Sequence, residues 1–421
     1  MNKRNFLKNL GLAGISSLTG FERLDNLLST VQHKEAASLA VDEDFWLAIR
    51  AGYSLKPDYI NLENGYYCIT PQEVLEKMIL HAREVNYQGS YYMRTVQWDN
   101  KQSICTQLAQ LAECTPEEVI ITRNTTESLD TIIQGIDWRS GDEAVMAEQD
   151  YGAMLDMFKL QAQRHGVVNR VVSVPNHPIT DDEIVNLYAA EITDKTRLLM
   201  VSHMINITGQ ILPIRKICDM AHARGVEVLV DGAHAFGHFK FSIPELNCDY
   251  YGTSLHKWLS APLGCGMLYV KKGKVRPLWQ MYGDMGKDPD DIRRINHTGT
   301  HPVYHDLAIG NAIEYQTRIG LERKEARLRF LQNYWTNKVR HWPRIVVNTP
   351  ADPARSCGIA NVGIEGMKPH DLAETLLKQY RIWTVAIDGA NVHGCRISPN
   401  LYTTVSELDQ FVKALYELSH L

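Results

Sequence analysis

The residue of this sequence most suited to covalent chemistry is a lysine with mainly apolar neighbours. Lys257 lies in the segment GTSLHKWLSAPLGCGMLYV, directly after His256 and before Trp258. Lysine is seldom fully buried without a partner, and a poorly solvated site favours its neutral form. A neutral amine attacks a carbonyl and forms a Schiff base. Lys257 is therefore the candidate catalytic residue.

A carboxylate earlier in the chain indicates what kind of compound this lysine would bind. In VLVDGAHAFGH, Asp231 directly follows a run of aliphatic residues. A carboxylate with little solvent needs a cationic or N–H partner, and a protonated pyridine nitrogen would be one. His234, three residues on, would then lie near a ring hydroxyl. The alternative is that Asp231 caps the next turn.

Three other segments place polar side chains after predicted strands. TRNTTESLD opens a helix, whose free N–H groups and dipole favour an anion, and Thr125 and Thr126 would add hydroxyl donors. Tyr151, in EQDYGAM, would stack on an aromatic ring, and Asn206, in SHMINITGQ, would donate to an oxyanion. Taken singly, a helix cap, a packed surface tyrosine and a turn asparagine explain these residues better.

Together, these residues match the requirements of one cofactor. Pyridoxal 5′-phosphate (PLP) needs a phosphate anchor, an acidic partner for its ring nitrogen, a stacking aromatic residue and a Schiff-base lysine. The candidate residues occur in order at the ends of successive strands, which makes separate capping roles the weaker explanation. We therefore predict that Thr126, Asp231 and Lys257 line one pocket.

The elements that would position these residues alternate between strand and helix. We expect strands at Val119–Thr122 and Val226–Val230, with others in DEAVMAEQ, TRLLMVS, CDYYGTS and CGMLYV, separated by helices. Such alternation predicts an α/β fold with a largely parallel sheet. Ligands of these sheets bind beyond the carboxyl ends of the strands, which is where the polar residues occur.

The last part of the chain has a different pattern. Long helical stretches follow Pro302, and then come short strands near Ile345–Val347 and Ile359–Val362, a helix around His370–Tyr380 and a closing helix. This pattern predicts a smaller α+β domain. We expect four parts in the chain: a possible leader at 1–40, a segment joining the small domain at 41–75, a large PLP-binding domain at 76–300 and the small C-terminal domain at 301–421.

From about residue 60 to 415, the chain resembles fold-type-I PLP enzymes of the class-V aminotransferase family. VDGAH with SLHKW at this spacing is the specific match, and NLENGYY, ITRNTTESLD, EQDYGAM, NHTGTHP and CRISPN agree with it. SHMINITGQILP and HKWLSAPLGCG fit the isopenicillin N epimerase-like branch best. The resemblance implies an aspartate aminotransferase-like fold and a homodimer that shares its active sites.

The resemblance also implies roles around the cofactor ring. Lys257 would form the Schiff base and move the Cα proton, and Asp231 would pair with the pyridine nitrogen. Tyr151 would stack on the ring, while His234 and Asn206 would lie near the ring hydroxyl.

Further roles concern the phosphate and the substrate. Four residues of the same subunit would hold the phosphate: Thr125, Thr126, Ser254 and His256. Thr300, in TGTHP, would reach the phosphate of the neighbouring subunit. Arg396 would take a substrate carboxylate, because its planar fork suits that bidentate task. Asn64 and Arg94 are further candidates for the substrate pocket.

The reaction type is narrowed by a missing thiol. Cysteine desulfurases carry a nucleophilic cysteine on a mobile loop before the carboxylate-binding arginine, whereas this chain reads TVAIDGANVHGCRIS there, with Cys395 next to Arg396. Cys357 fits a small core residue. We therefore expect a reaction at Cα or Cβ of an amino acid, with epimerisation or C–S/β-elimination favoured over transamination and desulfuration. A non-catalytic binding protein with a PLP-type fold is a further alternative.

Composition argues against several other classes. The net charge of −5 gives no support for nucleic-acid binding, and no apolar run reaches the length of a membrane span. The eight cysteines include no C-x-x-C pair, so neither a zinc site nor a disulfide framework is indicated. Without an H-E-x-x-H motif, a metal-dependent hydrolase is remote.

The N-terminus resembles an export leader. MNKRNFLKNLGLAGISSL places Lys3 and Arg4 before Phe6 and a mildly apolar stretch, as in a twin-arginine leader whose first arginine is replaced by lysine. SLA at 38–40 would be its cleavage site. We expect either periplasmic export by this route or a cytoplasmic protein with a basic amphipathic start.

Overall fold

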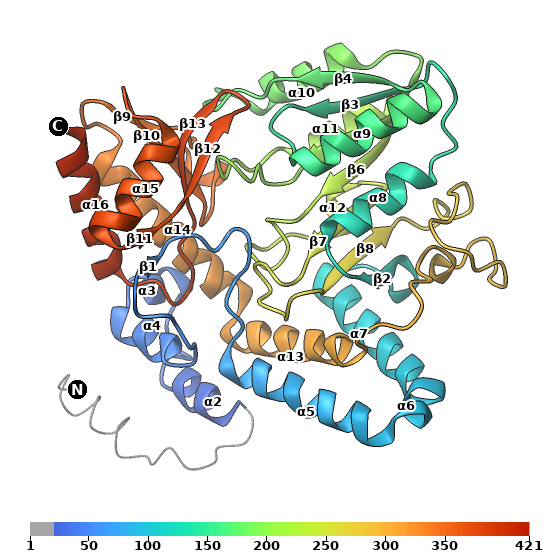
Figure 1. Ribbon diagram of the computed structural model, residues 1–421, viewed down its shortest axis with the longest axis horizontal. Coiled ribbons are helices and arrows are strands. Elements are labelled where there is room, and N and C mark those ends of the chain that lie inside the picture. The colour runs from blue at the N-terminus through green and yellow to red at the C-terminus, as the bar shows by residue number, and fades with distance from the viewer. Residues whose placement is uncertain (1–20, 421) are drawn as a thin grey trace.

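A seven-stranded sheet forms the centre of the large domain (Figure 1). In this computed structural model, which describes residues 21–420, the strand order is β2-β8-β7-β6-β5-β3-β4. All seven strands run in one direction except β8, which is antiparallel to both of its neighbours. The predicted α/β fold with a mixed, mostly parallel sheet is therefore confirmed. The strands are β2 (Val119–Thr122), β3 (Glu143–Ala147), β4 (Val168–Val172), β5 (Thr196–Ser202), β6 (Glu227–Asp231), β7 (Tyr250–Ser254) and β8 (Gly266–Val270).

Helices cover both faces of this sheet, because its inner strands carry apolar residues at successive positions. In β3, Ala144 and Met146 pack against one layer of helices, and Val145 and Ala147 pack against the other. The first layer contains α8 (Thr125–Gly135) and α9 (Gly152–His165). The second layer contains α7 (Val96–Ala112), α10 (Asp181–Glu191), α11 (Ile214–His222) and α12 (Ile243–Leu246).

A long helix from the C-terminal third packs on the large domain. The helical stretch predicted after Pro302 is divided by Gly320, whose φ of 93° is unfavourable for other residues, into α13 (Tyr304–Ile319) and α14 (Leu321–Val339). Helix α13 packs against α7 and against α5 (Gln72–Gln88), which continues into α6 (Ser90–Arg94). The chain therefore contributes to the large domain beyond the predicted boundary at residue 300.

The small domain is built on a four-stranded antiparallel sheet of order β12-β13-β10-β9. Helix α14 lies against α16, which begins at a capping box formed by Thr404 and Glu407. A separate parallel pair joins β1 (Ile60–Asn61) to β11 (Ile382–Trp383) and brings the segment after residue 60 to this domain. The other elements are β9 (Ile345–Val347), β10 (Ala360–Ile364), β12 (Val385–Gly389), β13 (Val392–Ile397), α15 (Pro369–Tyr380) and α16 (Val405–Ser419).

The first described helices pack into the body of the protein. These are α2 (Glu22–Ser29), α3 (Ala36–Ala40) and α4 (Glu43–Arg50). Leu24 and Leu39 are fully buried, and the indole of Trp46 donates to the carbonyl of Leu39. Residues 22–40, assigned from the sequence to the end of a possible leader, thus contribute to the core. The first part of that leader, residues 1–20, lies outside the described residues.

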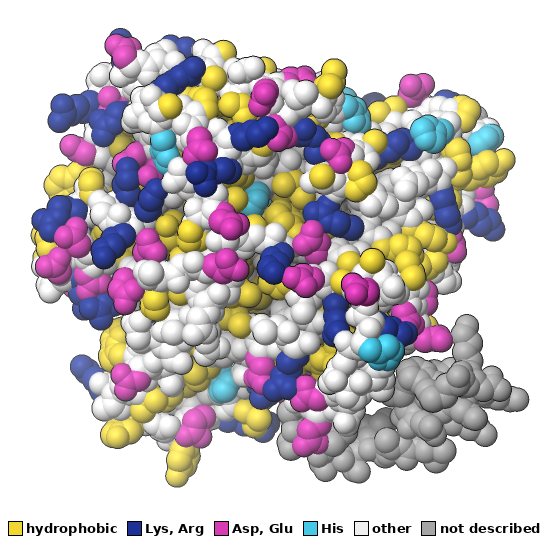
Figure 2. Space-filling model, turned by 180° about the vertical axis from the view of Figure 1, so that it is seen from behind, with side chains coloured by type: hydrophobic (Ala, Val, Ile, Leu, Met, Phe, Trp, Pro, Cys, Tyr) yellow, Lys and Arg dark blue, Asp and Glu magenta, His cyan; other side chains and the backbone are white. Residues whose placement is uncertain are grey.

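The surface carries mixed charge. Figure 2 shows basic and acidic side chains interspersed over one face, together with scattered hydrophobic groups. Within residues 21–420, none of the helices combines the length and apolar character needed to cross a membrane.

Candidate active site

The carboxyl ends of five strands meet at one edge of the large sheet and border a cavity of about 450 Å³. Its other wall comes from the small domain and from the segment after β1, through Gly65, Tyr66, Val385 and Ile387. Ten of the residues singled out in the sequence line this cavity: Thr125, Thr126, Tyr151, Asn206, Asp231, His234, Ser254, His256, Lys257 and Arg396. Thr126, Asp231 and Lys257 share one pocket, as expected.

The N-terminus of α8 opens into the cavity. Asn124 caps this helix, since its side chain accepts a hydrogen bond from the N–H of Glu127 at 2.9 Å. The capping role considered for the two threonines therefore falls to their neighbour. The N–H of Thr125 donates to Ser254 Oγ at 2.9 Å, and the two hydroxyls lie 2.7 Å apart. Hydroxyls and N–H groups at a helix start form a suitable anion site.

Asp231 is a buried carboxylate without a cationic partner. Its Oδ1 accepts from the N–H of Ala233 at 2.9 Å, and among the described residues no basic side chain comes within 4.0 Å of it. Burial raises the pKa of this carboxyl, although the N–H of Ala233 and the charge of Lys257 oppose the shift. An N–H donor from a bound ring would stabilise the ionised form.

Lys257 points into the cavity and contacts His234. Its Nζ lies 3.1 Å from Nε2 of His234. Burial lowers the pKa of Lys257 to about 8, with the positive charge of Arg396 adding to the effect and the charge of Asp231 opposing it. About a tenth of this amine is therefore in its neutral, nucleophilic form at pH 7, a far larger fraction than for a lysine of ordinary pKa.

The indole of Trp258 fixes the orientation of His234. Its Nε1–H donates to Nδ1 of His234 at 3.3 Å. An indole can only donate, so Nδ1 is the acceptor and the neutral ring carries its proton on Nε2. Burial holds the pKa of His234 well below its usual value, which keeps the ring neutral. The Nε2–H then faces Lys257 and favours the unprotonated amine.

Tyr151 and Asn206 occupy the loops after β3 and β5. Tyr151 is about half exposed and lies at the start of α9 on the cavity wall. The carbonyl of Asn206 accepts from Nη1 of Arg396 at 3.3 Å. Gly209 lets this loop approach the small domain, because its φ is 75° and a Cβ there would lie 2.0 Å from the carbonyl oxygen of Ile359.

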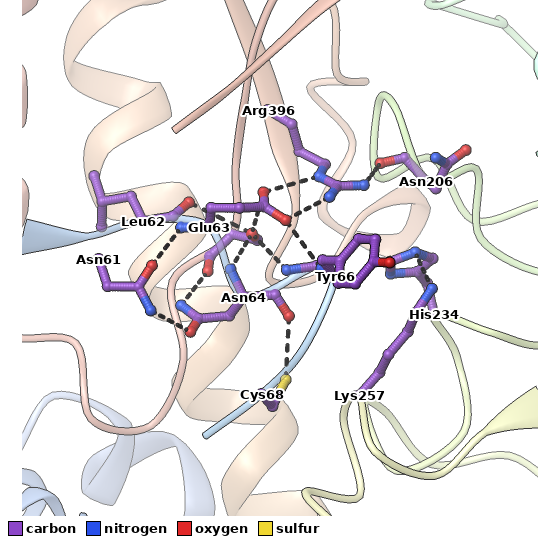
Figure 3. Close-up of polar contacts among 12 residues, drawn as sticks. Asn61, Leu62, Glu63, Asn64, Tyr66, Cys68, Asn206, His234, Lys257 and Arg396 are labelled. Atoms are coloured by element: carbon purple, nitrogen blue, oxygen red, sulfur yellow. Dashed lines mark hydrogen bonds and ion pairs between the residues drawn. The ribbon is translucent and has the colours of Figure 1, made fainter. Parts of the chain in front are cut away.

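Arg396, on β13, is paired with a carboxylate that the sequence did not single out. Its Nε and Nη2 donate to the two oxygens of Glu63 at 3.1 and 2.5 Å (Figure 3). Asn64, the next residue, is fully buried and does not line the cavity. Its amide nitrogen donates to the carbonyl of Ser398 at 2.7 Å, so it ties the segment after β1 to β13.

Arg94 and Thr300 lie outside this cavity. Both line a larger hollow of about 1300 Å³ between the α6–α7 region and the segment 284–301. Within a single chain neither lines the cavity of Lys257, so the structure does not bring Arg94 to the predicted substrate pocket, and the role predicted for Thr300 concerns a neighbouring subunit.

Comparison with known proteins decides the family. Residues 68–411 match the model of the family described as Aminotransferase class-V. The chain belongs to the class-V aminotransferase family. It is 28% identical over 396 residues to isopenicillin N epimerase of Amycolatopsis lactamdurans, covering 89% of this chain and 98% of that protein. It is also 28% identical over 334 residues to a cysteine desulfurase of Salmonella newport (strain SL254), covering 72% and 79%.

A solved structure agrees with this placement. The C-DES mutant with glycine covalently linked to its PLP cofactor superimposes with a TM-score of 0.78 at 21% identity, covering 87% of this chain and 98% of that one. The chain thus has the fold of a fold-type-I PLP enzyme, and as a class-V aminotransferase it is a PLP-dependent enzyme.

The residues of the cavity fit this cofactor. An amine of lowered pKa, an unpaired buried carboxylate and a hydroxyl-rich helix start are the groups that an aldehyde, a ring nitrogen and a phosphate require. Gly232, next to Asp231, is packed against the core, since a Cβ there would collide with the ring of Tyr251 at 2.1 Å.

No thiol lines the cavity of this class-V aminotransferase, among the residues the structure describes. Cys357 and Cys395 are fully buried, and burial raises the pKa of each to about 12. Cys68 is also buried and donates to the carbonyl of Asn64 at 3.2 Å. A mobile nucleophilic cysteine is thus absent from the site in residues 21–420.

Several residues of the site have no signal in the sequence. Glu63 reads as an ordinary acidic residue in NLENG, and its partner Arg396 is 333 positions away. Lys324, on α14, is fully buried and donates to the carbonyl of Trp258, next to Lys257.

Proposed function

We propose that this enzyme removes the Cα proton of an amino acid or amino-acid derivative, leading to epimerisation or to C–S/β-elimination. The observation that carries the proposal is the cavity shared by Lys257 and Asp231, into which no described thiol projects. The relationship to isopenicillin N epimerase over 98% of its length favours proton chemistry at Cα. Among residues 21–420, no thiol lines the cavity to serve as the nucleophile for desulfuration through a protein persulfide.

Different residues of the cavity would bind different parts of PLP. The start of α8, with Thr125, Thr126 and Ser254, would hold the phosphate of PLP. Asp231 would keep the ring nitrogen protonated, and Tyr151 would cover the ring. When bound, PLP withdraws electrons from Cα and so makes its proton acidic.

Lys257 supplies the base. Burial lowers the pKa of its amine to about 8, close to neutrality, which suits a group that both takes up and returns a proton. His234, held in one tautomer by Trp258, donates from Nε2 toward the reacting groups. The apolar side chains of Val385 and Ile387 limit water in this part of the cavity.

Proton exchange at Cα tests this proposal. The holoenzyme is incubated in D2O with single amino acids and amino-acid derivatives, and the products are followed by NMR and mass spectrometry. We expect deuterium at Cα together with either the opposite enantiomer or a β-elimination product. Keto acid with loss of the amine would instead identify an aminotransferase, and sulfide from cysteine that requires a protein cysteine would identify a desulfurase.

If none of these amino acids and derivatives changed the visible absorption of the bound PLP, the result would favour a non-catalytic binding protein. Such a protein would bind PLP without exchanging the lysine for a substrate amine. The presence of Lys257, Asp231 and the hydroxyls at the start of α8 in one cavity argues against this alternative.

We also propose that the active form is a homodimer. Hydrophobic side chains on α5 to α7 are exposed, and Figure 2 shows hydrophobic groups projecting at the lower edge of the molecule. The exposed aromatic residues of these helices include Tyr87 on α5, Tyr91 on α6 and Trp98 on α7. A second copy on this side would bring its Thr300 toward the first cavity. Light scattering tests the dimer, and a fully active monomer would contradict it.

A further inference from the structure

The guanidinium of Arg396 is occupied by a residue of the protein itself. Two of its nitrogens donate to Glu63, and the third donates to the carbonyl of Asn206 at 3.3 Å. Gly65 lies flat against it, because a Cβ at this position would be 2.7 Å from Cζ of Arg396. The side chains of Arg396 and Glu63 are only 8% and 6% exposed. The bidentate fork that would bind a substrate carboxylate is therefore already used.

Glu63 is held firmly in this position. Besides the two bonds from Arg396, its Oε1 accepts from the N–H of Tyr66 at 2.9 Å, and Ser398 Oγ lies 3.3 Å from Oε2 (Figure 3). These contacts come from the segment after β1 and from the end of β13, which are joined by several other hydrogen bonds. Glu63 is thus a built part of the cavity wall.

The charge of the pair is balanced. Glu63 neutralises Arg396, and a substrate carboxylate next to Arg396 would also lie close to the carboxylate of Glu63. Like charges a few ångströms apart repel strongly where solvent is scarce. The other arginine that lines the cavity, Arg123, is paired with Glu127 at 3.2 Å. Among the described residues of the cavity, no guanidinium is without a carboxylate partner.

Two apolar side chains of the small domain line the cavity on the side of Arg396. Val385, on β12, stands opposite Arg396 in the antiparallel register, and both Val385 and Ile387 line the cavity. Such a surface suits a substituent with little charge to desolvate.

We propose that Glu63 is a specificity-determining residue that lowers the affinity of this site for a free α-carboxylate. The preferred substrate is then an amino-acid derivative with a neutral group in that place, such as an amide or an ester. The inference rests on the proposed function, since it assumes that the substrate amine binds in the cavity of Lys257.

Two ligands without a Cα proton separate binding from reaction. We would titrate the holoenzyme with 2-methylalanine and with its primary amide, and read the dissociation constants from the visible absorption of the cofactor. The wild-type protein is expected to bind the amide at least as tightly as the acid. In Glu63→Gln the dissociation constant of the acid, divided by that of the amide, should fall by about tenfold or more. The reason is that one repelling charge is removed and Arg396 becomes free.

A matched control breaks an ion pair elsewhere. Glu143→Gln removes a largely buried carboxylate paired with Arg170 at 2.7 Å on β3, away from the cavity, and should leave the ratio unchanged. The two ligands differ in amine basicity, but this difference is the same in every variant and cancels from the comparison.

The outcomes distinguish the two proposals. Tighter binding of the acid than of the amide by tenfold or more in the wild type would overturn the role of Glu63 and leave the proposed function standing, even if Glu63→Gln did not fold. An unchanged ratio in a folded Glu63→Gln would overturn it as well. If neither ligand altered the spectrum of the wild type, both the inference and the proposed function would fail.

Discussion

Lys257 and Lys324 are enclosed by the same protein core, but only one of them faces a cavity. Burial lowers the pKa of both amines to about 8. Lys257 lines the cavity, with Nζ 3.1 Å from His234. Lys324 is fully buried on α14, where Nζ donates to Gln316 Oε1 at 3.0 Å and to the carbonyl of Trp258.

The comparison separates two requirements of a catalytic amine. Burial supplies the neutral form in both cases, but only access lets it react. Lys324 instead fastens the turn that carries Lys257, because the carbonyl it binds belongs to the next residue. One buried lysine thus performs the chemistry, and the other positions it.

The largest expected effect comes from removing the reactive amine. Lys257→Ala should reduce turnover by about 10⁴-fold or more, since nucleophile and base are lost together. The visible absorption band of the bound cofactor should change at the same time. Steady-state kinetics and absorption spectra of the holoenzyme measure both effects.

The matched variant is Lys324→Ala. It should weaken turnover far less than Lys257→Ala does and should keep the wild-type absorption band, because Lys324 has no access to the cofactor. If Lys324→Ala removed the band and Lys257→Ala kept it, the assignment of the two lysines would be reversed.

The next effect concerns stability and pH. Burial lowers the pKa of Lys324 from the ordinary lysine value of 10.5 to about 8 in the folded protein, so between these values the unfolded chain holds more protons. The stability contributed by this residue therefore rises with pH across that window, by up to about 1.4 kcal/mol per pH unit. Lys324→Met should lack this rise.

Denaturant unfolding measures the free energy of unfolding of the wild-type and variant holoenzymes. We would compare the two from pH 7.5 to 10.5, in steps of about half a pH unit, which covers the window of the pKa shift. Taking the difference cancels the other titrating groups. Lys272→Met, at an exposed position, is the control and should follow the wild type. A difference that does not change with pH would show that Lys324 is not desolvated as described.

A smaller effect is expected from substituting Trp258, which follows Lys257 and whose carbonyl accepts a hydrogen bond from Lys324. Trp258→Phe removes the donor to His234 Nδ1 but keeps an aromatic ring to stack on His238, whose centroid lies 3.6 Å away. Loss of one hydrogen bond of about 1 kcal/mol should lower turnover by about fivefold. The Nε2–H tautomer of His234 should also give way to a mixture.

Nitrogen NMR of labelled histidine reads this tautomer directly. His238 serves as an internal reference for the tautomer, because its Nδ1–H donates to the carbonyl of His234 at 2.8 Å and this bond does not involve the indole N–H. An unchanged His234 signal in Trp258→Phe would mean that another group fixes the ring.

The sequence could predict the cofactor side of the cavity but not its substrate side. Asp231 ends β6 and Lys257 follows β7, and the apolar pattern of such strands is local. Strand β2 appears at Val119–Thr122 as expected, and β6 is shifted by one residue. Glu63 and Arg396 meet only because β1 pairs with β11 and Asn64 bonds to Ser398. Such pairing depends on tertiary packing, which no local periodicity records.

The smallest effect is expected from the thiols. Cys357→Ala and Cys395→Ala should each leave turnover within about twofold of the wild type, because neither side chain lines the cavity. Any sulfide released from cysteine should also persist in both variants. Turnover and sulfide assays check this, and loss of sulfide release in either variant would restore the desulfurase interpretation.

The effect of burial on the two lysines also explains why Cys357 and Cys395 are expected to be unreactive. Burial favours the neutral form of every ionisable group. For an amine the neutral form is the nucleophile, so burial activates Lys257 when a cavity gives access. For a thiol the charged form is the nucleophile, and burial raises the pKa of Cys357 and Cys395 to about 12. The same desolvation that prepares this core for amine chemistry therefore makes its cysteines unreactive.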